Sequence, residues 1–200
     1  MKLLQLLIAF WTLTYITAAK AAWITEPYLG YGQISLKLGD EMLINGESTS
    51  YVLGARTGYK MGANLLLAAD YSRAGPYNLK FKNRYYGTSI DSGLFTLYTA
   101  GLGIELQLGQ WMLWLGGYPY HTLEEHKIDM QMKGSLRRAG LGFSLDAKTS
   151  IYFQYESSEL KMENPSSTAQ SIICYNTNID QCKKTGTATG LSFIITAHIN

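Results

Sequence analysis

The stretch Gly93–Tyr120, GLFTLYTAGLGIELQLGQWMLWLGGYPY, carries the alternation that decides the fold. From Leu94 to Leu108 the even-numbered residues are Leu, Thr, Tyr, Ala, Leu, Ile, Leu and Leu, whereas the odd-numbered residues become small and polar. A period of two indicates a strand whose faces meet different surroundings. Gly109-Gln110 predicts a tight turn, and the chain then returns to Tyr120. The first strand is long enough for a tilted membrane-spanning strand, which needs roughly 9–11 residues. We therefore predict a hairpin in a bilayer.

The same alternation recurs along the chain and predicts further strands in one continuous sheet. The predicted strands are residues 28–38, 51–61, 65–72, 94–108, 111–120, 135–146, 151–156 and 191–199. Their connections alternate between minimal turns, at 62–64, 109–110 and 147–149, and long polar segments, at 39–50, 73–92, 121–133 and 160–186. Short periplasmic turns and longer extracellular loops are typical of outer-membrane barrels. Closure is expected because an open strand edge in lipid leaves backbone groups unpaired.

The first 21 residues have the pattern of a cleavable signal peptide. Lys2 precedes an apolar run over residues 3–16, and Ala19-Lys20-Ala21 is a small-residue cleavage signal. The alternative, a buried or membrane-spanning helix, is disfavoured because the run is short. Removing residues 1–21 takes two of the 17 basic residues and none of the 15 acidic ones, which leaves 15 against 15. This neutral balance gives no support for nucleic acid binding. We predict one barrel domain over residues 22–200.

The two cysteines, Cys174 and Cys182, lie close together in a polar segment. In an exported chain such a pair predicts a disulfide in an oxidising compartment. Two unrelated free thiols are the alternative.

Taken together, the chain resembles the small eight-stranded outer-membrane β-barrels, a group that includes the transmembrane domain of OmpA and the OmpW-like proteins. The resemblance rests on the strand pattern and on segments such as EPYLGYGQ, VLGARTGYKM and RAGLGFSL. It implies an all-β fold, an eight-stranded antiparallel up-and-down transmembrane β-barrel in the outer membrane of a Gram-negative-type bacterium, and a monomer. Two departures stand out: the chain ends Ile199-Asn200 where the family commonly ends in an aromatic residue, and no peptidoglycan-binding domain is expected after the barrel.

Charged residues on the predicted inner faces are the first candidate site. Four bases and four acids are predicted to face inward: Lys37, Arg56, Lys60, Arg138, Asp70, Glu105, Asp146 and Glu156. The interior of an eight-stranded barrel is just wide enough for side chains to fill. Because an unpaired buried charge is costly, we expect these groups to pair into a plug. A narrow polar conduit is the alternative. Met112, Trp114 and Tyr118 add bulky packing inside the wall, which disfavours an open channel and leaves a small lateral or internal apolar pocket as a feature to look for.

Two further clusters lie in the predicted loop regions. Lys80, Lys82 and Arg84 share one face if the segment is extended, and could contact anionic lipopolysaccharide; a solvated strand extension is the competing interpretation. His121, Glu124, Glu125, His126 and Asp129 carry metal-ligand chemistry, but their spacing matches no metal motif, so we expect a hydrated loop and no metal site.

Catalysis has no support in the sequence. Some barrels of this size are lipid A deacylases or palmitoyl transferases, and a deacylase needs Ser, His and an acid together. The H-x-S arrangement of the deacylases is missing, since His121 is followed by Thr122 and Leu123, and His198 by Ile199 and Asn200. No G-x-S-x-G, P-loop or C-x-x-C is present, although spacing alone does not test a triad assembled from distant residues.

The predicted function is therefore a structural or surface-interaction role, with no cofactor and no enzymatic activity. The predicted partners are outer-membrane lipid, lipopolysaccharide and an extracellular ligand held by the loops. Passage of a small or hydrophobic solute, lipid A modification, and a soluble lipocalin-like barrel are the alternatives.

Overall fold

The computed structural model of the protein describes residues 22–38, 44–83, 89–125, 130–163 and 185–199. These residues form eight strands joined in chain order. The strands are β1 (Ala22–Leu38), β2 (Ile44–Met61), β3 (Leu65–Asn83), β4 (Ser89–Leu108), β5 (Trp111–Glu125), β6 (Met130–Ser144), β7 (Thr149–Glu163) and β8 (Thr185–Ala197). Within the described part of the chain, no helix is long and apolar enough to cross a membrane.

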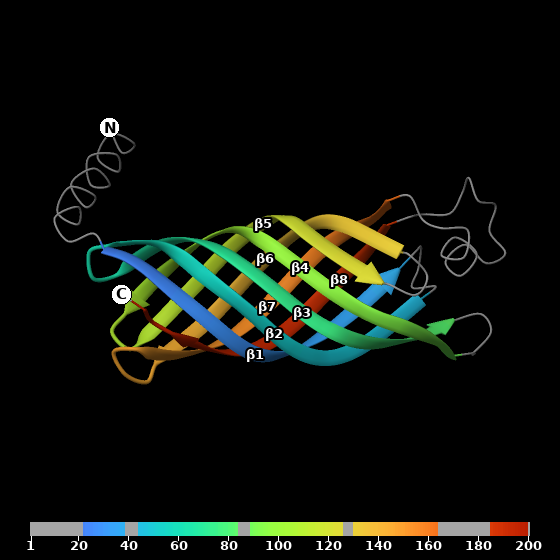
Figure 1. The fold of residues 1–200 in the computed structure, drawn as a ribbon, viewed down its shortest axis with the longest axis horizontal. Coiled ribbons are helices and arrows are strands. Elements are labelled where there is room, and N and C mark those ends of the chain that lie inside the picture. The colour runs from blue at the N-terminus through green and yellow to red at the C-terminus, as the bar shows by residue number, and fades with distance from the viewer. Residues whose placement is uncertain (1–21, 39–43, 84–88, 126–129, 164–184, 200) are drawn as a thin grey trace, which may run out of the picture.

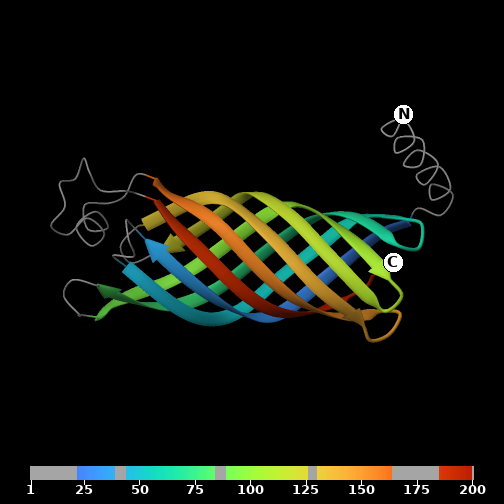
Figure 2. The same ribbon diagram turned by 180° about the vertical axis from the view of Figure 1, so that it is seen from behind.

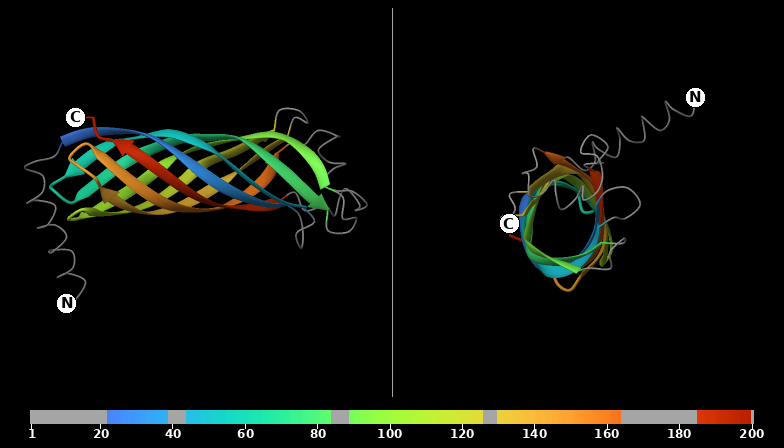
Figure 3. Two further views of the ribbon diagram at one scale, coloured as in Figure 1. Left: turned by 90° about the horizontal axis from the view of Figure 1, so that it is seen from below. Right: turned by 90° about the vertical axis from the view of Figure 1, so that its right-hand side faces the viewer.

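The sheet closes on itself. Each strand pairs antiparallel with the next, and β8 returns to β1, where Tyr31 lies opposite Phe193. Figures 1 and 2 show the strongly tilted strands from the front and from behind. The end-on view in Figure 3 shows the closed ring. This arrangement confirms the predicted up-and-down barrel and leaves no free strand edge.

The three short connections lie where the sequence predicts them. Gly62 and Gly109 adopt positive φ angles of 68° and 66° in the first two turns, a conformation that glycine tolerates best. The third turn covers residues 145–148. All three turns and the C-terminal residues lie at one end of the barrel, on the left in Figure 1. This is the periplasmic end of a barrel of this kind.

The segments predicted as long loops are largely strand. β3 continues to Asn83, β5 to Glu125 and β7 to Glu163, while β2 begins at Ile44. The long polar connection predicted over residues 121–133 is therefore wrong at 121–125 and 130–133, and the hydrated loop expected around His121 is wrong at 121–125. The strands are 13 to 20 residues long, more than the roughly 9–11 that a bilayer requires, so the barrel extends beyond the membrane.

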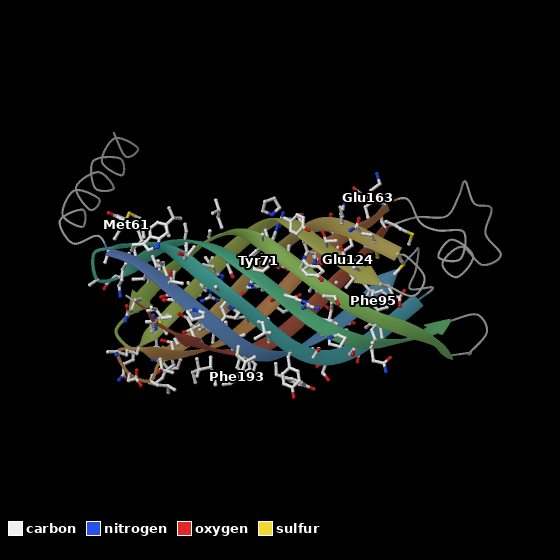
Figure 4. All side chains as sticks on the ribbon, in the orientation of Figure 1. Met61, Tyr71, Phe95, Glu124, Glu163 and Phe193 are labelled. Atoms are coloured by element: carbon white, nitrogen blue, oxygen red, sulfur yellow. The ribbon has the colours of Figure 1, made fainter. Side chains whose placement is uncertain are left out.

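An apolar band with an aromatic edge on each side surrounds the barrel. Near the short turns it is bordered by Trp23, Tyr59 and Trp111, and toward the other end by a ring that we call the tyrosine girdle: Tyr31, Tyr51, Tyr71, Tyr120 and Tyr155, all of them exposed. Figure 4 shows side chains standing on the outside of the wall, with Tyr71 and Phe193 labelled. Aromatic girdles about 25 Å apart mark the two interfaces of a bilayer in such barrels. The band therefore defines the lipid-facing region.

Beyond the tyrosine girdle the polarity of the two faces is inverted. We call this part of the barrel the collar. Its outer face carries charged side chains that are exposed or half-buried: Lys37, Glu47, Arg73, Lys133, Arg137, Glu159, Lys161 and Glu163. Its inner face is buried and, apart from Glu125, largely apolar: Ile34, Leu36, Leu79, Phe95, Leu123, Met130, Met132, Leu160 and Met162. Glu163, Glu124 and Phe95 mark this end in Figure 4. The collar thus has a hydrophobic core and a polar surface, as a water-soluble domain has.

Candidate functional site

Arg56 lies at the centre of the lumen. Its side chain projects from β2 and is fully buried. The guanidinium carbon is 4.0 Å from the ring centroid of Trp114 and 4.7 Å from that of Tyr152, both within cation–π range. Its Nε lies 3.6 Å from a carboxylate oxygen of Asp70, and its Nη1 lies 3.9 Å from Glu105. The cation is therefore held by aromatic faces and by two carboxylates.

Arg138 crosses the lumen from the opposite wall. From β6, its Nη1 donates to Asp70 Oδ2 on β3 at 2.9 Å, and its Nε donates to Glu156 Oε1 on β7 at 2.8 Å. Nη2 donates to Ser72 Oγ at 3.2 Å. Because Asp70 faces both arginines, one carboxylate connects β2, β3 and β6 through the middle of the barrel.

Tyrosine hydroxyls complete the shell around the two carboxylates. Tyr28 and Tyr118 donate to the two oxygens of Asp70, at 2.7 and 2.6 Å. Tyr152 donates to Glu105. Hydrogen bonds to a charged acceptor are about twice as strong as those between neutral groups. These phenols therefore compensate for the burial of the charges and fix the position of the carboxylates.

Glycines on neighbouring strands make room for these large side chains. A Cβ at Gly54 would lie 2.3 Å from the Tyr28 ring, and one at Gly103 would lie 2.2 Å from the Trp114 ring. A Cβ at Gly142 would likewise lie 2.5 Å from the Tyr152 ring. These glycines therefore leave the space that the aromatic rings occupy. Any side chain there would displace a ring from the network.

Five of the eight charges predicted to face the lumen meet in this network: Arg56, Asp70, Glu105, Arg138 and Glu156. Lys60 lies at the periplasmic mouth, where its Nζ donates to Gln107 Oε1 at 3.1 Å. Asp146 is exposed in the turn before β7 and lines the cavity at the same mouth, so it lies apart from the charged network. The predicted inward position of Lys37 is wrong. Its neighbour Leu36 is fully buried inside the collar, whereas Lys37 faces outward.

On the collar side of the charged network, the free space inside the barrel is small. A cavity of about 20 Å³ lies between the charged network and the apolar core of the collar, and His121, Tyr77 and Arg138 contribute to its lining. This volume suits about one water molecule. The inner positions of Met112, Trp114 and Tyr118 agree with the packing expected from the sequence. An apolar groove does lie on the lipid side of the wall, between β4, β5 and β6, at Leu102, Gly117 and Ala139.

The histidines and carboxylates of residues 121–129, for which the sequence predicts no metal site, are only partly described. His121 points inward and its Nδ1 lies 3.2 Å from Thr99 Oγ1, whereas the half-exposed Glu124 accepts a hydrogen bond from Gln131. His126 and Asp129 lie outside the described residues. Among the residues that the structure describes, no group of three His, Cys, Asp or Glu side chains is arranged to hold a metal ion.

The predicted basic face over residues 80–84 is only partly covered by the structure. The backbone of Lys80 and Lys82 belongs to β3, which agrees with an extended segment. Their side chains, and all of Arg84, lie outside the described part. Cys174 and Cys182, and the signal peptide over residues 1–21, also lie outside it. Lipopolysaccharide contact by these bases, the disulfide and the signal peptide remain predictions.

Among the described residues, a lysine-lined groove lies on the outer face of the collar. The groove has a volume of about 1060 Å³ and crosses β6, β7, β8 and β1. Three lysines line it, Lys37, Lys133 and Lys161, together with Glu159, Thr185 and Thr187. Lys133 also forms an ion pair with Glu163 at 2.7 Å. The sequence pattern did not indicate this groove, because Lys133 and Lys161 lie in segments predicted as loops and Lys37 is predicted to face the lumen. Glu26 and Ser150 at the periplasmic mouth were not indicated either, because both precede the predicted strands.

A closed barrel with a lipid-facing apolar band and a filled polar lumen defines the class of the protein. It is a small eight-stranded outer-membrane β-barrel, located in the outer membrane of a Gram-negative-type bacterium. No protein-family model matches the chain, and no curated protein matches it.

Solved structures of the same fold do match. The chain is similar to the outer membrane protein OprG from Pseudomonas aeruginosa, with a TM-score of 0.52, 9% identity, and coverage of 90% of this chain and 97% of that one. Neisserial surface protein A matches with a TM-score of 0.47 and 12% identity over 88% of this chain and 97% of that one. Ail of Yersinia pestis matches with a TM-score of 0.46 and 13% identity over 88% and 98%. At these identities the likeness concerns the fold alone.

Proposed function

We propose that the protein is a closed, non-conducting barrel that holds a rigid collar above the outer leaflet and acts through the outer surface of that collar. The observation that carries this proposal is the position of Asp70, which bonds Arg138 from the far wall and faces Arg56 from the neighbouring strand. A bond from β3 to β6 spans the lumen. Trp114, Tyr28 and Tyr118 fill the space around it.

The plug makes passage of ions costly. Opening a path would require the removal of a partner from a buried charge, which costs about 3–5 kcal/mol. A further barrier lies above it, where the apolar side chains of the collar core are packed together. Two barriers of different chemistry therefore lie in series, and this arrangement favours an anchor over a conduit.

Conductance across a planar bilayer tests the closed state. We expect the purified protein to give no steady current above that of the empty bilayer. The double variant Arg138→Ala/Tyr118→Ala should give brief openings, because it removes both the bond across the lumen and one of the rings around it. Steady open currents from the unchanged protein would overturn the proposal.

The ligand that the collar fits best is the phosphorylated headgroup region of lipopolysaccharide. Lys37, Lys133 and Lys161 surround a groove just beyond the tyrosine girdle, where headgroups of the outer leaflet lie. Lysines recognise phosphate as point charges, and each basic residue near an anionic surface contributes about 1 kcal/mol. The threonines of β8 in the same groove add hydroxyls that suit sugar groups.

Binding of lipopolysaccharide to the purified protein in a neutral detergent tests this ligand. The triple variant Lys37→Gln/Lys133→Gln/Lys161→Gln should bind about 100-fold more weakly if each lysine contributes about 1 kcal/mol. Lys148→Gln is the matched control, since Lys148 is exposed in a periplasmic turn at the other end of the barrel. Equal losses in both variants would show a general charge effect and would contradict a site in the groove.

A further inference from the structure

Three polar side chains meet at the periplasmic mouth of the lumen. Glu26 comes from β1, Ser150 from β7, and His198 directly follows β8. Ser150 Oγ lies 2.9 Å from His198 Nε2, and His198 Nδ1 lies 2.7 Å from Glu26 Oε1. Glu26 and Ser150 are buried, whereas the side chain of His198 is 19% exposed. The imidazole therefore bridges a serine and a glutamate, one on each ring nitrogen.

The backbone around His198 is fixed on both sides. Its N–H donates to Lys148 O at 2.7 Å, which ties it to the turn before β7. The next residue, Ile199, exchanges two backbone hydrogen bonds with Thr25, at 2.9 and 3.1 Å, which tie it to β1. The ring is thus held between the two strands that supply its partners. Such pre-positioning reduces the reorganisation needed for proton transfer.

The arrangement sets the chemistry of the two ring nitrogens. Because a carboxylate oxygen only accepts and Glu26 Oε1 lies 2.7 Å from Nδ1, neutral His198 keeps its proton on Nδ1, on the side of Glu26. The lone pair on Nε2 then faces the hydroxyl of Ser150. This is the order of groups through which a histidine takes the proton of an attacking serine and an acid holds the histidine in the correct tautomer.

A cavity adjoins this arrangement. It has a volume of about 530 Å³ and is lined by all three residues. Ile24, Leu66 and Met112 form an apolar wall, while Lys60 and Asn64 contribute polar groups. An apolar wall suits an acyl chain, and the ammonium of Lys60 can stabilise a developing oxyanion. If the three residues only held their strands together, the contacts of His198 with Ser150 and Glu26 would be enough, and no cavity beside them would be needed.

We propose that Ser150, His198 and Glu26 form a hydrolytic site for small carboxylic esters that enter from the periplasmic end. Ser150 Oγ bonds to the ester carbonyl carbon as its proton passes to His198 Nε2. The C–O bond to the alcohol then breaks, and the leaving alkoxide takes that proton. Water next attacks the acyl-Ser150 ester with His198 as base, which releases the carboxylic acid and restores the serine hydroxyl. Glu26 is a positioning residue that acts through His198. The proposal rests neither on the barrel being closed nor on the groove of the collar.

The charges around His198 predict the pH dependence of this activity. The hydrogen bond to Glu26 raises the pKa of His198, and Glu105 raises it further, against the opposing effects of burial and Lys60. The carboxylate of Asp146 also interacts with it. Only the neutral imidazole accepts the serine proton, so turnover should increase with pH through a value above the usual 6.5 or so.

Hydrolysis of p-nitrophenyl acetate and labelling by a fluorophosphonate test the site in the folded, detergent-solubilised protein. We expect the label on Ser150 by mass spectrometry and turnover that Ser150→Ala removes. Ser144→Ala is the matched control, because Ser144 lines the same cavity and lies opposite Ser150 in the sheet, while its hydroxyl bonds Asp146 O. Glu26→Gln should reduce turnover and move the pH midpoint downward.

Heat-modifiable migration on gels shows whether each variant is folded, so a loss of activity from misfolding is distinguished from a loss of the nucleophile. The proposal is overturned if folded wild-type protein leaves Ser150 unlabelled, or if Ser150→Ala hydrolyses the ester as fast as wild type.

Discussion

The lipid-facing part of the barrel and the collar consist of the same strands but have opposite polarity. Between the girdles Leu102 is 64% exposed on the outside while Arg56 is fully buried inside. In the collar Lys133 is exposed on the outside while Leu160 is buried inside. The solvent outside the wall determines which face is apolar, because lipid accepts apolar side chains and water accepts charges. One strand therefore satisfies two environments by exchanging the roles of its faces along its length.

The largest effect should come from the charged lumen. Asp70→Asn removes the carboxylate that faces both Arg56 and Arg138, and should lower the free energy of unfolding by about 3–5 kcal/mol. Urea unfolding in phospholipid vesicles, followed by tryptophan fluorescence, measures the change. Asp146→Asn is the control, since that carboxylate lies in an exposed turn and should matter little. If Asp70→Asn is as stable as wild type, the ion pairs do not stabilise the lumen, and the lumen and the collar do not differ in what stabilises them.

The collar should depend instead on apolar packing. Leu123→Ala creates a cavity at a fully buried position inside the collar and should cost about 2–5 kcal/mol. Leu102→Ala removes the same atoms from the lipid face, where lipid chains fill the space, and should cost less than about 1 kcal/mol. The same unfolding measurement compares the two. Equal costs would show that the collar interior is not a packed core.

A lysine scan along β8 locates the boundary between the two regions. Phe193, Leu191, Thr189 and Thr187 face outward in order from the band to the collar. A lysine on the lipid face costs about 2–4 kcal/mol near the bilayer midplane and close to zero at the interface. We expect the cost to be greatest at Phe193→Lys and to disappear by Thr187→Lys. A flat profile would contradict a membrane boundary at the tyrosine girdle.

This inversion also explains how much of the fold the sequence could predict. The alternation in Leu94–Leu108 and the turns at Gly62 and Gly109 predict strand order and membrane crossing correctly, because period two and tight turns are local properties. The same alternation does not say which face is inside. The rule that polar residues face inward predicts Lys37 in the lumen. This rule fails in the collar, where the outside is water and the apolar side chain of Leu36 is buried inside.

The candidate sites were less predictable, since they depend on register. Arg138 and Asp70 are separated by 68 positions in the chain and meet only because the closed barrel turns their strands toward one lumen. Ser150, Glu26 and His198 likewise come from separate strands, without a motif in the sequence. The packing of the aromatic rings on glycines depends on the adjacent strand: Tyr28 lies opposite Gly54, and Trp114 lies diagonal to Gly103. A pattern within one strand contains no information about these neighbours.

The smallest predicted effect lies in the periplasmic turn, where a local charge takes the place of packing. Asp146 accepts backbone hydrogen bonds from Lys148 at 2.6 Å and Thr149 at 2.8 Å, and these bonds lower the pKa of its carboxyl. A lowered pKa contributes stability above the unfolded value near 3.9 and loses it as the pH falls through the folded value. Asp146→Asn should therefore be slightly less stable than wild type at pH 7, and the difference should shrink below about pH 4. Protonation of Asp146 removes its charge but keeps its shape. A stability difference between wild type and Asp146→Asn that stays constant across this pH range would therefore contradict a role for the charge.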